Sequence, residues 1–163
     1  MPVPCVPDNV VARQIIASCE AHFAANAGDC NEFLKAVLAD FLAAGYLDGL
    51  NADGIVQKLQ HPDEAWTRSR AIPTAIAMAK TGQIVIAGMA SDSLGQHHGH
   101  VAVIVGCDGQ PSGGTVVPLG YAGALDNPAA QLRGGRLSGT FAAAMVQAEQ
   151  IDYYFKVPDR GPA

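Results

Sequence analysis

The sequence predicts an α+β fold in which N-terminal helices pack on a central antiparallel sheet. Two observations support this class. Apolar residues recur with helical spacing in the first half of the chain, and β-branched runs bounded by glycines follow in the second half. With 163 residues, 49% of them hydrophobic and 15% charged, the chain has the size and composition of one packed globular domain spanning residues 1–163.

Two helices are expected at the N-terminal end. Asp8 is the predicted N-cap of the first, in which apolar residues recur every four positions, and Gly28 ends it. Asp29 is the predicted N-cap of the second, whose apolar face runs over residues 33–42 before Gly45 closes it. A helix on each side of residues 28–29 implies a tight turn there.

The middle of the chain is more polar. Residues 51–73 read as a connection holding one short helix after Asp53, because the apolar positions there keep helical spacing. Residues 74–80 predict another short helix, which Gly82 ends. The hydrophobic period then changes from helical to extended.

Strands are expected from that point. Residues 83–87, 100–105 and 115–117 are β-branched runs and predict consecutive antiparallel strands. Residues 141–148 predict a helix, and residues 151–157 predict a last strand. Helices first and strands later is the order typical of an α+β domain.

Charge and hydropathy exclude two classes of partner. The net charge is -5, and the ten Lys and Arg residues are scattered, so nothing provides the basic surface that binds a phosphate backbone. The first seven residues hold three prolines, and Arg13, Glu20 and His22 interrupt the apolar residues that follow. We therefore expect no nucleic acid partner, no signal peptide and no insertion into a membrane.

The four cysteines have no C-x-x-C spacing, which argues against a structural zinc site and a thioredoxin-type pair. Cys19 lies on the apolar stripe of the first helix and is expected in the core. Cys5 and Cys107 lie in loop or turn settings, where each is either an idle thiol or half of a disulfide. The cysteines therefore leave the disulfide state and the compartment open.

Cys30 is the predicted nucleophile. It falls in the first turn of the second helix, where free backbone N–H groups and the helix dipole favour a thiolate. It precedes Phe33 and Leu34 by three and four residues, so its thiol is expected along the core-facing stripe. Its backbone N–H is also expected to contribute to an oxyanion hole.

His100 is the predicted general base, because it begins a strongly β-branched strand and can be rigidly held there. A thiolate–imidazolium pair with Cys30 is expected to lower the pKa of the thiol, and activity is expected to fall as His100 loses its proton. His97, His98 and His100 are alternatively zinc ligands, but no second cluster completes such a site. We therefore predict no metal and no cofactor.

Three segments carry a resemblance to a known family. Gly28-Asp29-Cys30-Asn31-Glu32-Phe33, Gln83-Ile84-Val85-Ile86-Ala87-Gly88 and Gly99-His100-Val101-Ala102-Val103-Ile104 together resemble the NlpC/P60 and CHAP group of peptidoglycan amidases. Within that group the chain looks most like the type VI secretion amidase effectors, especially their first family. The resemblance implies a papain-like NlpC/P60 fold and a Cys30–His100 dyad.

The resemblance also implies a biological role. Such a protein is an antibacterial toxin, made in the cytoplasm, secreted by a type VI system and active in the periplasm of a rival bacterium. It cuts the γ-D-glutamyl to meso-diaminopimelate amide of the peptidoglycan stem peptide through a thioester intermediate. A cognate immunity protein inhibits it in the producer, and the enzyme itself is expected to be a monomer.

One position departs from the family pattern. Many relatives carry a polar third residue on the strand after the histidine strand, whereas residues 115–119 offer only Thr115. We therefore expect a backbone carbonyl near Pro118 to orient the imidazole of His100. The substrate groove is expected to include the four residues Asp29, His98, Tyr121 and Trp66.

Other functions fit the same residues. Related effectors cut the diaminopimelate to D-alanine crosslink, and housekeeping or phage wall hydrolases share the fold. A catalytically silent interaction domain is the alternative from another class. Replacement of Cys30 by Ala separates the enzyme from the silent domain, since only an amidase loses activity.

Overall fold

The computed structural model describes residues 3–162, and residues 1, 2 and 163 of the expected domain lie outside this part. The described residues form an α+β fold with an antiparallel sheet, which confirms the predicted class. The sheet has six strands in the order β1-β8-β2-β3-β6-β7. Their bounds are β1 Thr67–Ser69, β2 Ile84–Met89, β3 His100–Ile104, β6 Leu119–Ala122, β7 Leu132–Arg136 and β8 Asp152–Lys156.

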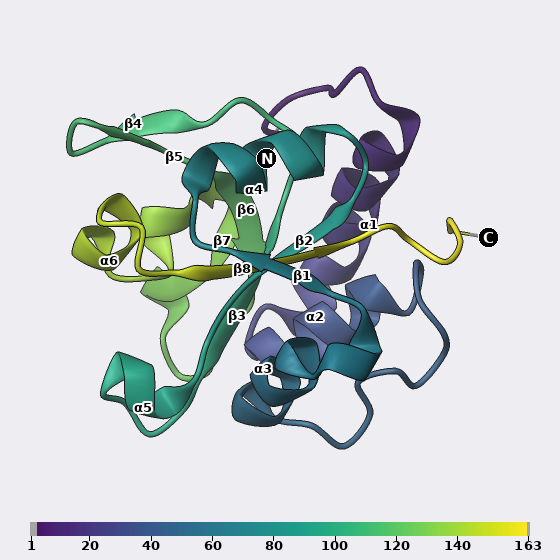
Figure 1. Ribbon diagram of the computed structural model, residues 1–163, viewed down its shortest axis with the longest axis horizontal. Helices are drawn as coiled ribbons and strands as arrows, with labels where there is room; N and C mark the ends of the chain where they lie inside the picture. The colour runs from purple at the N-terminus through teal and green to yellow at the C-terminus, as the bar shows by residue number, and fades with distance from the viewer. Residues whose placement is uncertain (1–2, 163) are drawn as a thin grey trace.

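The helices are α1 (Val10–Asn26), α2 (Cys30–Leu38), α3 (Ala52–Gln60), α4 (Ile72–Lys80), α5 (Ser91–Leu94) and α6 (Ala143–Gln147). The described residues also form three short 3-10 turns, η1 (Pro62–Glu64) after α3, η2 (Pro128–Ala130) before β7 and η3 (Leu137–Gly139) after β7. Figure 1 shows α1, α2 and α3 together beside the sheet, with α6 on the opposite side of the view. No helix of residues 3–162 has the length and apolarity to cross a membrane.

Each face of the sheet covers a hydrophobic core. Along β2, Ile84 and Ile86 pack with the residues of α1, α2 and α3, whereas Val85 and Ala87 pack with those of α4 and the C-terminal segments. Side chains alternate in this way because successive residues of a strand point to opposite faces. The N-terminal helices are therefore one layer, and the sheet is buried on both sides.

Polar side chains cap the first two helices, at a different residue than predicted in α1 and at the predicted residue in α2. The side chain of Asn9, not of Asp8, caps α1 and accepts a hydrogen bond from the Ala12 N–H at 3.0 Å. The Asp8 prediction was wrong because α1 begins one residue later than a cap at Asp8 requires. Asp29 caps α2 as predicted, accepting from the N–H groups of Asn31 and Glu32.

The second helix is shorter than its apolar face. It ends at Leu38, and the chain continues through i to i−3 hydrogen bonds, from Asp40 to Val37 and from Phe41 to Leu38. Phe41 and Leu42 are nevertheless buried in the same core. The apolar spacing therefore identified the buried residues correctly but overestimated the length of the helix.

The strand after β3 was assigned to the wrong sheet. Residues 115–117, β5, pair with β4 (Gln110–Ser112) in a separate hairpin, and β6 takes the place beside β3. The turn at Gly113 and Gly114 has positive φ at both glycines, which allows the hairpin to close. Pro118 then separates β5 from β6, since it has no N–H for a ladder.

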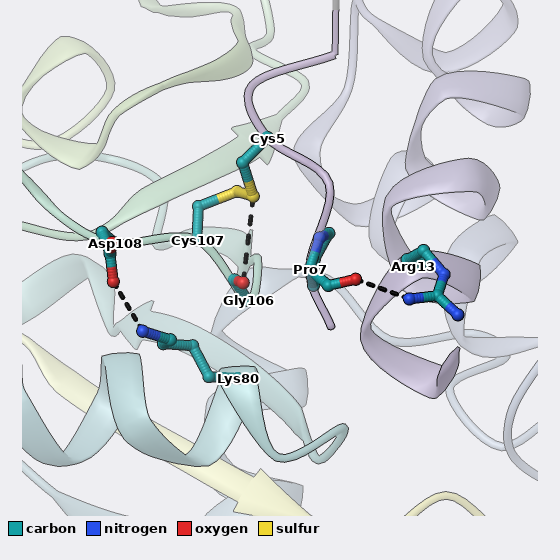
Figure 2. Close-up of a disulfide and its surroundings, with 7 residues drawn as sticks. All are labelled: Cys5, Pro7, Arg13, Lys80, Gly106, Cys107 and Asp108. Carbon is teal, nitrogen blue, oxygen red and sulfur yellow. Dashed lines mark hydrogen bonds and ion pairs between the residues drawn. A yellow bond between two sulfur atoms is a disulfide. The ribbon is translucent and has the colours of Figure 1, made fainter. Parts of the chain in front are cut away.

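A disulfide joins Cys5 to Cys107, a pairing that the sequence left open. It attaches the segment before α1 to the turn after β3, with the two Cα atoms 5.8 Å apart and 102 residues apart in sequence. Figure 2 shows this bond and, farther along the same N-terminal segment, the Pro7 carbonyl, which accepts from the Arg13 guanidinium at 2.7 Å. The N-terminal segment is thereby held against the fold.

Candidate active site

Cys30 is the first residue of α2 and is 8% exposed. The N–H groups of the next three residues are satisfied, two by the Asp29 carboxylate and that of Phe33 by the Asp29 carbonyl. The backbone N–H of Cys30 lowers the pKa of its own thiol and donates to no other described residue. It is therefore the first-turn donor that remains available to a ligand.

The turn that presents Cys30 is held by the end of β6. The Ala124 N–H donates to the Ala27 carbonyl at 2.9 Å. A Cβ at Gly123 would lie 2.5 Å from the Asp29 carbonyl oxygen and 2.7 Å from that of Asn26, so only glycine permits this close approach. The sheet thus determines where α2 begins.

His100 is the first residue of β3 and pairs with Met89 at the end of β2. Its Nε2 lies 2.6 Å from the hydroxyl of Thr140. The ring also packs edge-on against Phe141, with centroids 4.8 Å apart and planes at 62°. The imidazole is therefore held by contacts on two sides.

Cys30 and His100 line the same cavity, which has a volume of about 280 Å³. The wall is formed by the start of α2, the start of α3, the loop before β3, and residues after β6 and η3. Its charged members are the carboxylates Asp29 and Asp53, and no Lys or Arg is among the described lining residues. Both oxygens of the Asp53 carboxylate accept from Ser91, Oδ1 from its N–H and Oδ2 from its hydroxyl.

The resting thiol hydrogen-bonds a neighbour other than the imidazole. Its hydrogen bond goes to the Asn31 side-chain oxygen at 3.5 Å. No hydrogen bond joins Cys30 to the His100 ring among the described residues. The backbone of Val101, the residue after His100, lowers the pKa of the thiol, so the thiol lies near the start of β3.

Burial dominates the electrostatics of both groups. It raises the pKa of the Cys30 thiol, which the Val101 backbone lowers and Asp29 raises further. Burial also lowers the pKa of His100 to about 4. The expectation of a thiolate–imidazolium pair was wrong for this resting state, because removing both groups from water disfavours both charges.

The four expected groove residues divide into two pairs. Asp29 and His98 line the cavity, whereas Tyr121 and Trp66 do not. Tyr121 is 0% exposed and packs edge-on against Phe23 in the core between α1 and the sheet. Trp66 donates its Nε1–H to the Tyr46 hydroxyl at 2.9 Å. Both aromatic side chains therefore stabilise the fold and are corrected to packing residues.

The Pro118 carbonyl, expected to orient His100, has a different partner. It accepts from the Leu137 N–H at 2.9 Å, and the His100 ring meets Thr140 instead. Among residues 3–162, no three His, Cys, Asp or Glu side chains are arranged to hold a metal ion. The polar residues that the sequence did not single out here are Asn31, Asp53 and Thr140.

A scan against models of protein families matches none of them, and a search of curated proteins finds no significant match. The chemistry of the cavity therefore has to be judged from its own geometry.

Proposed function

We propose that the chain is a cysteine amidase with a papain-like NlpC/P60 fold, acting on the stem peptides of peptidoglycan. The observation that carries the proposal is that Cys30, at a helix start, and His100, at a strand start, line one cavity. These are the two groups that thiol-based amide hydrolysis requires, a nucleophile and a base on rigid elements.

The proposed reaction starts from the neutral pair. His100 takes the proton of the Cys30 thiol as the sulfur attacks the amide carbonyl, and a carbon–sulfur bond forms. The tetrahedral intermediate then breaks its carbon–nitrogen bond, and the imidazolium of His100 gives its proton to the leaving amine. Water next attacks the thioester with His100 as base, which releases the acid and restores the thiol.

The developing oxyanion needs a donor, and the N–H of Cys30 at the start of α2, which donates to no other described residue, can serve. Losing one donor of this kind typically costs about 3 to 4 kcal/mol of transition-state stabilisation. Burial of the site strengthens such a hydrogen bond, since the local dielectric constant is low.

The charges of the cavity support a substrate with a cationic group. Asp29 and Asp53 are its charged residues, and no described Lys or Arg lines it. The Asp29 carboxylate uses one oxygen, Oδ1, for both capping bonds. A diaminopimelate residue carries a free ammonium group, and such a field attracts it. We propose the γ-D-glutamyl to meso-diaminopimelate bond as the bond cleaved.

The disulfide supports action in an oxidising compartment such as the periplasm, because the cytosol keeps thiols reduced. Together with the family resemblance, this favours an antibacterial effector that a type VI system delivers to a rival's periplasm. A cognate immunity protein is the proposed inhibitor in the producing cell.

Digestion of purified peptidoglycan tests the activity. Wild-type protein, Cys30→Ala and His100→Ala are incubated with wall material, and new termini are identified by mass spectrometry. Wild type is expected to release a new glutamate carboxyl and a new diaminopimelate amine. Both variants are expected to lose at least about a thousandfold in rate, since nucleophile and base act as a unit.

Matched controls separate chemistry from folding. Cys19→Ala removes the other free thiol, which is 0% exposed and outside the cavity, and His61→Ala removes an exposed histidine. Both are expected to keep wild-type specific activity once folded. Release of D-alanine carboxyls would move the assignment to the crosslink, and wall cleavage that survives Cys30→Ala would refute the cysteine amidase.

A further inference from the structure

The residue that faces His100 comes from a part of the chain far from both proposed catalytic residues. The Thr140 hydroxyl lies 2.6 Å from Nε2 of His100, and Thr140 lines the same cavity. Thr140 lies 40 positions after His100 in the sequence, beyond β6 and β7, and directly follows η3. It is the ring's hydrogen-bonding partner among the described residues.

Thr140 is itself firmly placed. Its N–H donates to the Leu137 carbonyl at 3.1 Å, and the Leu137 side chain is fully buried. The Leu137 N–H donates in turn to the Pro118 carbonyl between β5 and β6. The Pro118 carbonyl therefore affects His100 indirectly, by holding the turn that carries Thr140.

A neutral imidazole carries one proton, on either of its two nitrogens, and only the other nitrogen can act as a base. A hydroxyl that accepts from Nε2–H keeps the proton there. Because Nε2 is engaged with Thr140, Nδ1 is then the nitrogen with a free electron pair. This is the form that can take the proton of the Cys30 thiol.

We propose that Thr140 is the positioning residue of the site, whose hydroxyl holds His100 in the tautomer protonated on Nε2. This inference rests on the proposed amidase function for its catalytic consequence. The contact permits either direction of the hydrogen bond, and we propose the one in which the hydroxyl accepts, because it leaves Nδ1 free to act as the base.

A neutral hydroxyl also suits the electrostatics of the cavity. Besides Cys30, the other titratable groups that line it are Asp29, Asp53, His97 and His98, and none of these described groups hydrogen-bonds the His100 ring. The Asp53 carboxylate accepts from Ser91, and Asp29 caps α2. Thr140 thus orients the base without a negative charge that would hold it protonated.

The test compares Thr140→Val, which keeps the side-chain shape and removes the hydroxyl, with Thr140→Ser, which keeps the hydroxyl. On peptidoglycan, Thr140→Val is expected to lower kcat between about tenfold and a hundredfold, as loss of an orienting partner typically does, with KM little changed. Thr140→Ser is expected to stay within about threefold of wild type.

Nitrogen-15 NMR of His100 gives a readout that does not depend on activity. In the wild type at pH 7 we expect the Nε2-protonated tautomer, and in Thr140→Val a mixture of both tautomers. A wild-type ring protonated on Nδ1, or a Thr140→Val protein with unchanged tautomer and kcat, would overturn the proposal. The wild-type spectrum decides this point even if the valine variant fails to fold.

The two proposals fail in different ways. The amidase is refuted, and the positioning role is kept, if the wild-type protein cleaves no wall peptide while its His100 ring shows the Nε2 tautomer and Thr140→Val loses that tautomer. Wild-type cleavage with the same kcat in Thr140→Val refutes the positioning role and keeps the amidase.

Discussion

Removal of the Cys5–Cys107 disulfide is expected to destabilise the protein strongly. The bond closes a loop whose ends are 102 residues apart in sequence, which is most of the chain. In the chain-entropy model, a closed loop of roughly 100 residues restricts the unfolded chain by about 4.7 kcal/mol. Native disulfides of small domains are worth about 2 to 5 kcal/mol when removed, so the expected loss lies at the upper end of that range.

The native contacts near the disulfide explain why little of this stabilisation is expected to be offset by strain in the folded protein. Arg13 donates to the carbonyls of Pro7 and Asp8, so the segment before α1 keeps its course near Cys5. Cys107 is buried at the end of the turn after β3. Serine at both positions therefore removes the crosslink while leaving the neighbouring anchors in place.

Urea unfolding measures the effect. Trp66 is the only tryptophan and packs against the core, so its fluorescence reports on the tertiary structure. The free energy of unfolding is compared for the oxidised wild type, the reduced wild type and the Cys5→Ser/Cys107→Ser variant. Reductant should destabilise the wild type and leave the variant unchanged. A difference below about 1 kcal/mol between oxidised and reduced wild type would refute the loop-closure reasoning.

Two further predictions concern the site. Wall cleavage measured as kcat/KM is expected to rise with pH near the His100 pKa of about 4, where the base loses its proton. Activity is expected to hold beyond the ordinary thiol range, because burial raises the pKa of Cys30. Activity that falls at a pH above the ordinary histidine pKa of about 6.5, as an imidazolium held by a thiolate loses its proton, would instead indicate the ion pair. Gly123→Ala places a Cβ 2.5 Å from the Asp29 carbonyl oxygen, so it is expected to cost about 1 to 3 kcal/mol of stability and to reduce activity by displacing the start of α2. Gly28→Ala, whose Cβ meets nothing within 4 Å, is the matched control in thermal unfolding and wall cleavage. Equal stability of the two variants would contradict the role of the close contact between Gly123 and the turn before α2.

The sequence alone determined the elements that depend on local chemistry. Asp29 was identified as the cap of α2 because an acidic residue before a run of helical spacing satisfies free N–H groups. The β-branched runs predicted β2 and β3, and the positions of Cys30 and His100 at element starts followed from the same patterns. Periodicity and capping are written in neighbouring residues, so they can be read without the fold.

Only the tertiary structure decided what depends on distant segments. Thr140 meets His100 because β6, β7 and η3 carry the chain back to the cavity, and no local pattern indicates that return. Tyr121 is buried rather than in the groove because of the face it occupies on β6. The neutral state of the Cys30–His100 pair likewise follows from burial, which the packing of α2 and β3 determines. Long-range pairing and desolvation depend on the whole fold, so they cannot be read from adjacent residues.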